Sequence, residues 1–145
     1  MFRELLVGTV ASVCNIAIHE LVMATVVQIS LRFAGAKEKV RQSLRLTTVM
    51  IATVSIATVP ILMTAHFSEV MVWSLAYAIV GTAPAGADPV YFAFVNYTTL
   101  GYGDVIPVER GRLLGPTTAM NGVLMFGGST AVIFEVLRRT ARRGD

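Results

Sequence analysis

Thr99-Leu100-Gly101-Tyr102-Gly103-Asp104 is the stretch that decides the fold, because two glycines alternate with larger residues in it. Gly101 and Gly103 can adopt the left-handed region of φ/ψ space without a Cβ clash. A chain that alternates between left- and right-handed residues can turn successive carbonyl groups in the same direction. The stretch therefore predicts a loop of alternating backbone handedness that can line up its carbonyl oxygens.

The residues before this loop predict a helix too short to cross a membrane. Gly81–Pro89 contains the glycines, prolines and aspartate that are typical of a turn. At its end, Asp88 is placed to cap a helix and Pro89 suits the first helical position. We expect a short helix over 89–98, followed at once by the loop. This combination indicates a re-entrant element, which a membrane tolerates only where it is buried in protein or lines water.

The composition indicates a membrane protein. The chain is 54% hydrophobic and only 14% charged, with a mean hydropathy of +0.67, which is too apolar for a soluble domain. Its net charge of +3 is weak evidence for nucleic acid, and we expect no such partner. We expect an all-α membrane protein with three transmembrane helices and the re-entrant element between the second and third. The apolar segments long enough to span are Leu5–Leu31, Leu44–Val80 and Leu113–Leu137.

Clustered positive charges predict the orientation. The segments Arg32–Arg45 and Arg138–Arg143 flank the apolar segments, and both belong in the cytoplasm by the positive-inside rule. Three spans then place the N-terminus outside and the C-terminus in the cytoplasm, in a multi-pass protein of the cell (inner) membrane. Membrane lipids are the expected surroundings, and the first basic segment is a candidate contact for anionic lipid. The lone Cys14 lies in the first apolar segment and is expected to be a small packing residue.

The second apolar segment leaves two alternatives open. Leu44–Val80 is nearly twice as long as one span requires, and Pro60 can kink a helix there. Either the helix tilts steeply, or it leaves the bilayer near His66 and continues outside. Trp73 and Tyr77 would then form an aromatic belt at the interface.

The loop resembles the selectivity filter of the potassium-channel pore family, whose signature is Thr-x-Gly-Tyr-Gly followed by Asp. Val105-Ile106-Pro107 and Gly111-Arg112 resemble the exit loop of that family and the start of its inner helix. The resemblance covers Ala87 to Arg139. It implies a homotetrameric, potassium-selective channel that conducts passively, is no enzyme and needs no cofactor besides K⁺. The implied K⁺ ligands are the backbone carbonyls of Thr99, Leu100, Gly101 and Tyr102 and the Thr99 hydroxyl, with Gly103 completing the filter.

The resemblance also implies a division of the chain. Residues 1–45 would be a peripheral transmembrane helix with a basic cytoplasmic loop, and residues 46–145 a pore domain. The side chain of Tyr102 would pack against the pore helix, whose negative C-terminal end would face the cavity. The implied parts of the pore domain are an outer helix at 46–80, a pore helix at 89–98, a filter at 99–104 and an inner helix at 112–139.

The support behind the filter departs from the family pattern. Many members hold the filter aspartate with a Glu or Trp of the pore helix, whereas Val95 and Phe92 stand here at the corresponding positions. Neither side chain can form a hydrogen bond, so Asp104 needs another partner. The residues expected to support the filter are Asp104, Thr98, Tyr91 and Asn96, with Tyr91 and Asn96 as candidate partners of Asp104.

Small and polar residues of the third span are candidates for the cavity and the gate. Gly122 falls where many family members have a hinge glycine, and Gly127 matches a second small position. Such glycines allow bending, but they also allow helices to pack closely, and both roles stay open. Asn121, Thr118 and Thr130 are candidates to face the conduction path.

Four ionisable residues in the apolar segments suggest either packing or pH sensing. His19 and Glu20 lie mid-span, where charge is costly, and Asn15 precedes His19 by one turn on the same face. A buried pair that joins helices is the favoured interpretation. His66 and Glu69, three residues apart, are interpreted as a surface pair, with a proton sensor as the alternative.

Two other function classes remain possible from the sequence. A pore of the same fold could be non-selective. A proton-coupled carrier would use the four ionisable residues, although no nucleophile constellation or metal-ligand spacing supports an enzyme. No segment carries the regularly spaced arginines of a voltage sensor, and the tail after Leu137 is too short for a soluble ligand-binding domain.

Overall fold

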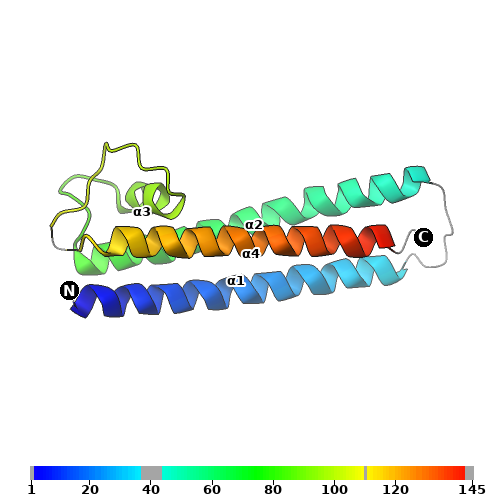
Figure 1. The fold of residues 1–145 in the computed structure, drawn as a ribbon, viewed down its shortest axis with the longest axis horizontal. Coiled ribbons are helices and arrows are strands. Elements are labelled where there is room, and N and C mark those ends of the chain that lie inside the picture. Colours follow the sequence, from blue (N-terminus) through cyan, green and yellow to red (C-terminus); the bar gives the residue numbers. More distant parts are fainter. Residues whose placement is uncertain (1, 37–43, 110, 143–145) are drawn as a thin grey trace.

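The computed structural model describes residues 2–36, 44–109 and 111–142, and every regular element in these ranges is helical (Figure 1). The all-α prediction is therefore confirmed. The basic residues Lys37, Lys39 and Arg41 lie outside the described residues. The four helices are α1 (Phe2–Ala36), α2 (Leu44–Val80), α3 (Pro89–Tyr97) and α4 (Leu114–Arg142).

Three of the helices are long and apolar enough to cross a membrane. Their candidate spans are Phe2–Ile29, Ile56–Val80 and Leu114–Arg138. α2 runs opposite to α1 and α4, so the N-terminal end of α1 lies at the same end of the molecule as α3 (Figure 1). The candidate span in α2 includes His66, and α2 continues as one helix through Pro60.

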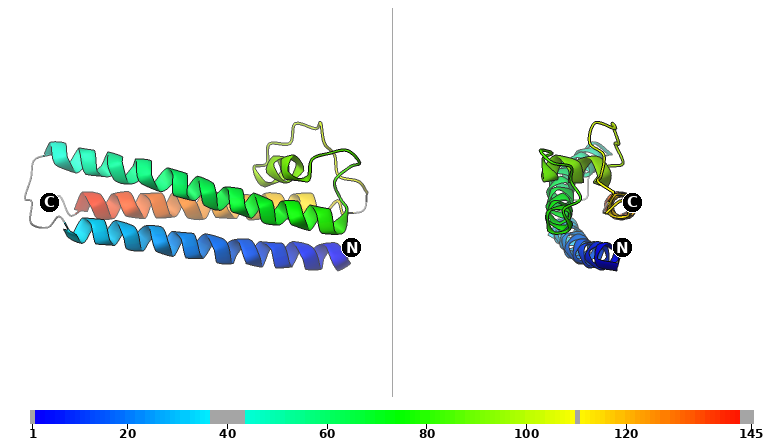
Figure 2. Two further views of the ribbon diagram at one scale, coloured as in Figure 1. Left: turned by 180° about the vertical axis from the view of Figure 1, so that it is seen from behind. Right: turned by 90° about the vertical axis from the view of Figure 1, so that its left-hand side faces the viewer.

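α1 and α3 lie on different sides of the pair formed by α2 and α4. Each of them packs against both α2 and α4, whereas the described parts of α1 and α3 make no contact with one another (Figure 2). Arg3 lies in the first turn of α1, and its guanidinium donates to the carbonyl oxygen of Ile79 at 3.0 Å. The first helix is thus joined to the C-terminal end of α2. Cys14 on α1 is exposed, so its predicted packing role is wrong.

Aromatic residues fill the core between α2, α3 and α4. Trp73 and Tyr77 of α2 are fully buried, as are Phe92 and Tyr97 of α3. The rings of Tyr77 and Phe92 meet edge to face with centroids 4.7 Å apart, a favoured aromatic geometry. The prediction that Trp73 and Tyr77 form an interfacial belt is therefore wrong, because both are packed inside the chain.

Capping residues fix both ends of α3. The Asp88 carboxylate accepts a hydrogen bond from the backbone N–H of Val90 at 2.8 Å, and Pro89 occupies the first turn. The helix ends at Tyr97, one residue earlier than predicted, because Thr98 is its C-cap. The predicted cap at Asp88 is confirmed, and the short helix enters the loop at Thr98.

Candidate functional site

The backbone of the loop after α3 alternates in handedness. The φ angle is 58° at Thr99, 54° at Gly101 and 80° at Gly103, whereas Leu100 and Tyr102 have no positive φ. Residues of opposite handedness in alternation can direct successive carbonyl groups to one side of the chain. The glycines at positions 101 and 103 predicted two of these positive φ angles. The third, at Thr99, was not predicted.

Thr99 holds a conformation that its side chain disfavours. A positive φ is a genuine outlier for a β-branched residue, and such strain persists only where the surroundings enforce it. Here two backbone hydrogen bonds attach the start of the loop to the end of α3. The Thr99 N–H donates to the carbonyl of Asn96 at 3.1 Å, and the Leu100 N–H donates to that of Val95 at 2.9 Å. The loop conformation is thus anchored on the last turn of α3.

Asp104 at the far end of the loop is held by a tyrosine of α3. The Tyr91 hydroxyl donates to Oδ2 of Asp104 at 2.6 Å, and this hydrogen bond raises the pKa of the Tyr91 phenol. The other candidate, Asn96, instead donates to the carbonyl of Phe92 at 2.8 Å. Thr98 donates to the carbonyl of Phe94 at 2.7 Å and so serves α3 rather than Asp104.

Replacing Tyr91 by Phe is expected to weaken the hold on Asp104 without disturbing the fold. Tyr91 is exposed, so removing its hydroxyl leaves no buried cavity. A hydrogen bond to a charged group is stronger than one between neutral groups, but exposure to solvent weakens it. We expect the K⁺ flux that the sequence resemblance implies to begin at the wild-type rate but to decline faster during sustained conduction. Steady flux indistinguishable from wild type would show that Tyr91 does not stabilise the loop.

The side chains of the loop are left uncovered by the rest of the chain. Tyr102 is 70% exposed and Leu100 is also exposed. The prediction that Tyr102 packs against the short helix is therefore wrong within one chain.

Gly122 on α4 is a contact point rather than an open position. A Cβ placed on Gly122 would lie 2.0 Å from the carbonyl oxygen of Tyr97, at the end of α3. Only a glycine lets α4 approach the backbone of α3 this closely. A Cβ on Gly127, by contrast, would meet nothing within 4 Å. Of the two roles considered for Gly122, close packing is the one that the structure displays.

The predicted cavity residues of α4 do not share one face. Thr118 is fully buried and its hydroxyl lies 2.7 Å from that of Tyr77. Asn121 is buried as well, and its Oδ1 accepts hydrogen bonds from Asn15 of α1 and Trp73 of α2, both at 3.0 Å. The prediction that Thr118 and Asn121 face a conduction path is therefore wrong, because Thr118 faces α2 and Asn121 faces α1 and α2. Thr130 is exposed and donates to the carbonyl of Phe126.

A second polar site lies in the middle of the helices, where three ionisable side chains meet. We call His19, His66 and Glu69 the histidine–glutamate cluster. His19 Nδ1 lies 2.8 Å from Glu69 Oε1, and His66 Nδ1 lies 3.0 Å from Glu69 Oε2. The Tyr97 hydroxyl donates to the same carboxylate. The cluster thus connects α1 and α2 to the last residue of α3.

The four ionisable residues do not pair as their sequence positions predict. His66 and Glu69 are not a surface pair, since Glu69 is 0% exposed and His66 is largely buried. Glu20 points away from the cluster and is exposed. Asn15 does share the buried face of His19, as predicted, and donates to the backbone carbonyl of Glu69 at 3.3 Å.

Two members of this buried network were not found from the sequence. Tyr97 binds Glu69, and Ser129 of α4 has its Oγ 3.0 Å from Nε2 of His66. Nothing in the residue pattern distinguishes Ser129 from other small residues of α4. Tyr97, however, is the last residue before the loop, and a phenol in an apolar helix needs a partner when buried. The need of a buried phenol for a hydrogen-bond partner was the sequence signal that could have identified Tyr97.

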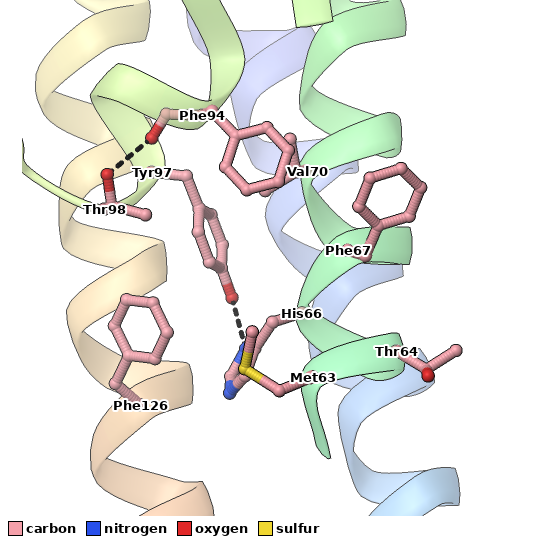
Figure 3. Close-up of a pocket in the computed structure, with 9 residues that line it drawn as sticks. All are labelled: Met63, Thr64, His66, Phe67, Val70, Phe94, Tyr97, Thr98 and Phe126. Carbon is pink, nitrogen blue, oxygen red and sulfur yellow. Dashed lines mark hydrogen bonds between the residues drawn. The ribbon is translucent and has the colours of Figure 1, made fainter. Parts of the chain in front are cut away.

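A pocket of about 370 Å³ opens beside the cluster, between α2, α3 and α4. Figure 3 shows the imidazole of His66 and the hydroxyl of Tyr97 directed toward one another at its edge. Most of the lining is apolar, and its polar side chains are those of His66, Tyr97, Thr64 and Thr98. The lining residues are Met63, Thr64, His66, Phe67, Val70, Phe94, Tyr97, Thr98 and Phe126.

Comparison with protein families assigns the part of the chain that carries the loop. A family model described as an ion channel matches residues 65–139, which is more than half of the chain. The chain belongs to this ion channel family. The matched part of the channel includes the last turns of α2, all of α3, the loop and most of α4, and leaves α1 outside. No curated protein and no solved structure matches the chain.

Proposed function

We propose that this ion channel is selective for potassium and conducts K⁺ passively through the loop Thr99–Gly103. The observation that carries the proposal is the positive φ at every second residue of the loop, at Thr99, Gly101 and Gly103. A backbone of alternating handedness can present a column of carbonyl oxygens, which can replace the hydration shell of K⁺. The carbonyls of Thr99, Leu100, Gly101 and Tyr102 would be the ligands, with the Thr99 hydroxyl below them.

One chain supplies only a quarter of such a ring, so the proposed unit is a homotetramer around a fourfold axis. The exposure of Leu100 and Tyr102 in the single chain supports this arrangement, because neighbouring subunits would cover them. α3 would be the re-entrant pore helix, with the negative end of its dipole toward the central cavity. α1 would lie outside the ring, since it packs on the side of α2 and α4 that is remote from α3.

The proposed orientation follows from the shared end of α1 and α3. The N-terminus lies at the filter end (Figure 1), and the basic C-terminal end of α4 lies at the other. By the positive-inside rule, the filter and the N-terminus would face the outside of the cell (inner) membrane and the C-terminus the cytoplasm.

Ion flux into liposomes tests the proposed selectivity. Purified protein in vesicles is expected to pass K⁺ at least about tenfold faster than Na⁺. A free-energy difference of about 1.4 kcal/mol between the two ions in the filter is enough for a factor of ten. Ba²⁺ is expected to block the flux. Equal K⁺ and Na⁺ flux would instead indicate the non-selective pore that the fold also permits.

The carrier alternative receives less support from the geometry. It requires Glu20 to act with the histidines, but Glu20 is exposed and apart from the cluster. A flux of K⁺ that continues without a proton gradient would separate a passive channel from a proton-coupled carrier.

A further inference from the structure

The histidine–glutamate cluster brings together side chains that are far apart in the sequence. His19 comes from the middle of α1, and His66 and Glu69 are three residues apart on one face of α2. The two imidazole rings have centroids 5.5 Å apart. Each of the three side chains offers one donor atom, and these atoms all lie within 4.8 Å of one another.

We propose that this cluster is a binding site for a divalent transition-metal ion, with Zn²⁺ as the best fit. Two imidazole nitrogens and one carboxylate oxygen are a ligand set that Zn²⁺ uses where it keeps a fourth position open. Nitrogen-rich sites of this kind select transition metals over Ca²⁺ and Mg²⁺, which prefer oxygen ligands. The Tyr97 hydroxyl, already bound to Glu69, lies beside the three ligands.

The surroundings of His66 are suited to a metal ligand. Its Nδ1 faces Glu69, while its Nε2 lies 3.0 Å from the hydroxyl oxygen of Ser129. Metal-binding imidazoles commonly donate their second ring N–H to an oxygen, which fixes the tautomer and the ring orientation. Ser129 therefore holds the ring so that Nδ1 keeps its electron pair toward the cluster when a metal binds.

The charge of the cluster also favours a bound cation. Glu69 is 0% exposed, and its carboxylate meets only His19, His66 and Tyr97 among the described residues. A buried carboxylate without a cationic partner is costly. Nε2 of His19 is buried without a hydrogen-bond partner, so the contact with Glu69 does not satisfy both ring nitrogens. A divalent ion would compensate the carboxylate directly.

A route into the site is provided by the pocket between α2, α3 and α4. The pocket has a volume of about 370 Å³, and His66 and Tyr97 form part of its wall. Figure 3 shows both side chains reaching into this region from α2 and α3. His66 lines the pocket and its Nδ1 lies 3.0 Å from Oε2 of Glu69, so the pocket borders the cluster.

Metal binding to the full-length protein tests the proposal. The protein is purified through a tag without histidine, stripped with a chelator and titrated with Zn²⁺ by calorimetry. We expect one Zn²⁺ per chain and a rise in the thermal midpoint, because an ion that binds only the folded state stabilises it. Co²⁺ in place of Zn²⁺ is expected to give the absorption bands of tetrahedral coordination.

Matched variants assign the ligands. His19→Asn keeps an amide donor near Glu69 but removes the imidazole, and Glu69→Gln removes the carboxylate. Each is expected to lower Zn²⁺ affinity more than about tenfold, since loss of even an outer partner costs about 10–100-fold. Glu20→Gln removes the neighbouring exposed carboxylate and is expected to leave affinity unchanged.

Three results would overturn the site. They are a folded wild-type protein that takes up no Zn²⁺, a Co²⁺ spectrum of octahedral coordination, and wild-type affinity in both His19→Asn and Glu69→Gln. The first two results come from the wild-type protein, so they test the proposal even if a substitution prevents folding. All three are read from binding rather than from flux, and are therefore independent of whether the channel selects K⁺.

Discussion

Gly103→Ala is expected to abolish K⁺-selective flux, whereas Gly86→Ala leaves it at the wild-type level. The two glycines have nearly the same backbone conformation, with φ of 80° and 84°, and a Cβ would meet nothing within 4 Å at either. An L-residue in this region costs roughly 1–2 kcal/mol, so both variants bear the same local strain. They differ in position, because Gly86 lies in the turn before α3 and Gly103 lies in the proposed filter.

The effect at Gly103 is large because the strain is repeated in each subunit of the proposed tetramer. About 1–2 kcal/mol in each of four chains corresponds to at least about a hundredfold in rate, since about 1.4 kcal/mol is a factor of ten. The strain is relieved by turning the backbone, and the carbonyl of Tyr102 then no longer faces the ion. The measurement is K⁺ and Na⁺ flux into liposomes, with tetramer content checked by size-exclusion chromatography.

Equal loss of flux in both variants would show that the strain acts on folding rather than on the ion path. Normal K⁺ selectivity in Gly103→Ala would contradict the filter itself. Because Gly86→Ala controls for backbone strain, a loss confined to Gly103→Ala can be assigned to the loop. The thermal midpoints of the two variants are expected to agree.

The sequence predicts those elements whose formation depends on neighbouring residues alone. Apolar length predicts the three long helices, and the capping chemistry of Asp88 and Pro89 predicts where α3 begins. The glycines of the loop predict positive φ at 101 and 103. At Thr99 the local preference points the other way, and only the hydrogen bonds to the end of α3 explain its conformation.

The buried faces of the spans were not predictable in the same way. In a soluble helix the polar face marks the surface, but in a membrane both lipid and the protein core are apolar. The pattern around His66 and Glu69 therefore did not reveal that they are buried. Their partner His19 is on a different helix, 50 residues from Glu69 along the chain, so it could not be found from helical spacing. For the same reason Asn121 was assigned to the cavity, although it faces α1 and α2.

Gly122→Ala is expected to disrupt the channel, whereas Gly127→Ala is expected to be tolerated. The added methyl group at Gly122 would lie 2.0 Å from the carbonyl oxygen of Tyr97, and backbone atoms cannot rotate away as a side chain can. α4 and the end of α3 must therefore separate, which costs about 1–3 kcal/mol for overpacking and displaces the residues that lead into Thr99.

Gly127 provides the matched control, since it lies on the same helix and a Cβ there meets nothing. Alanine is favoured over glycine inside a helix by about 1 kcal/mol, so Gly127→Ala is expected to raise the thermal midpoint slightly and to keep K⁺ flux. Gly122→Ala is expected to lower the midpoint and to reduce flux more than about tenfold. Wild-type flux in Gly122→Ala would refute the packing role. Reduced open probability in Gly127→Ala, with a normal midpoint, would instead identify Gly127 as a hinge, because only a bending role requires glycine where space is free.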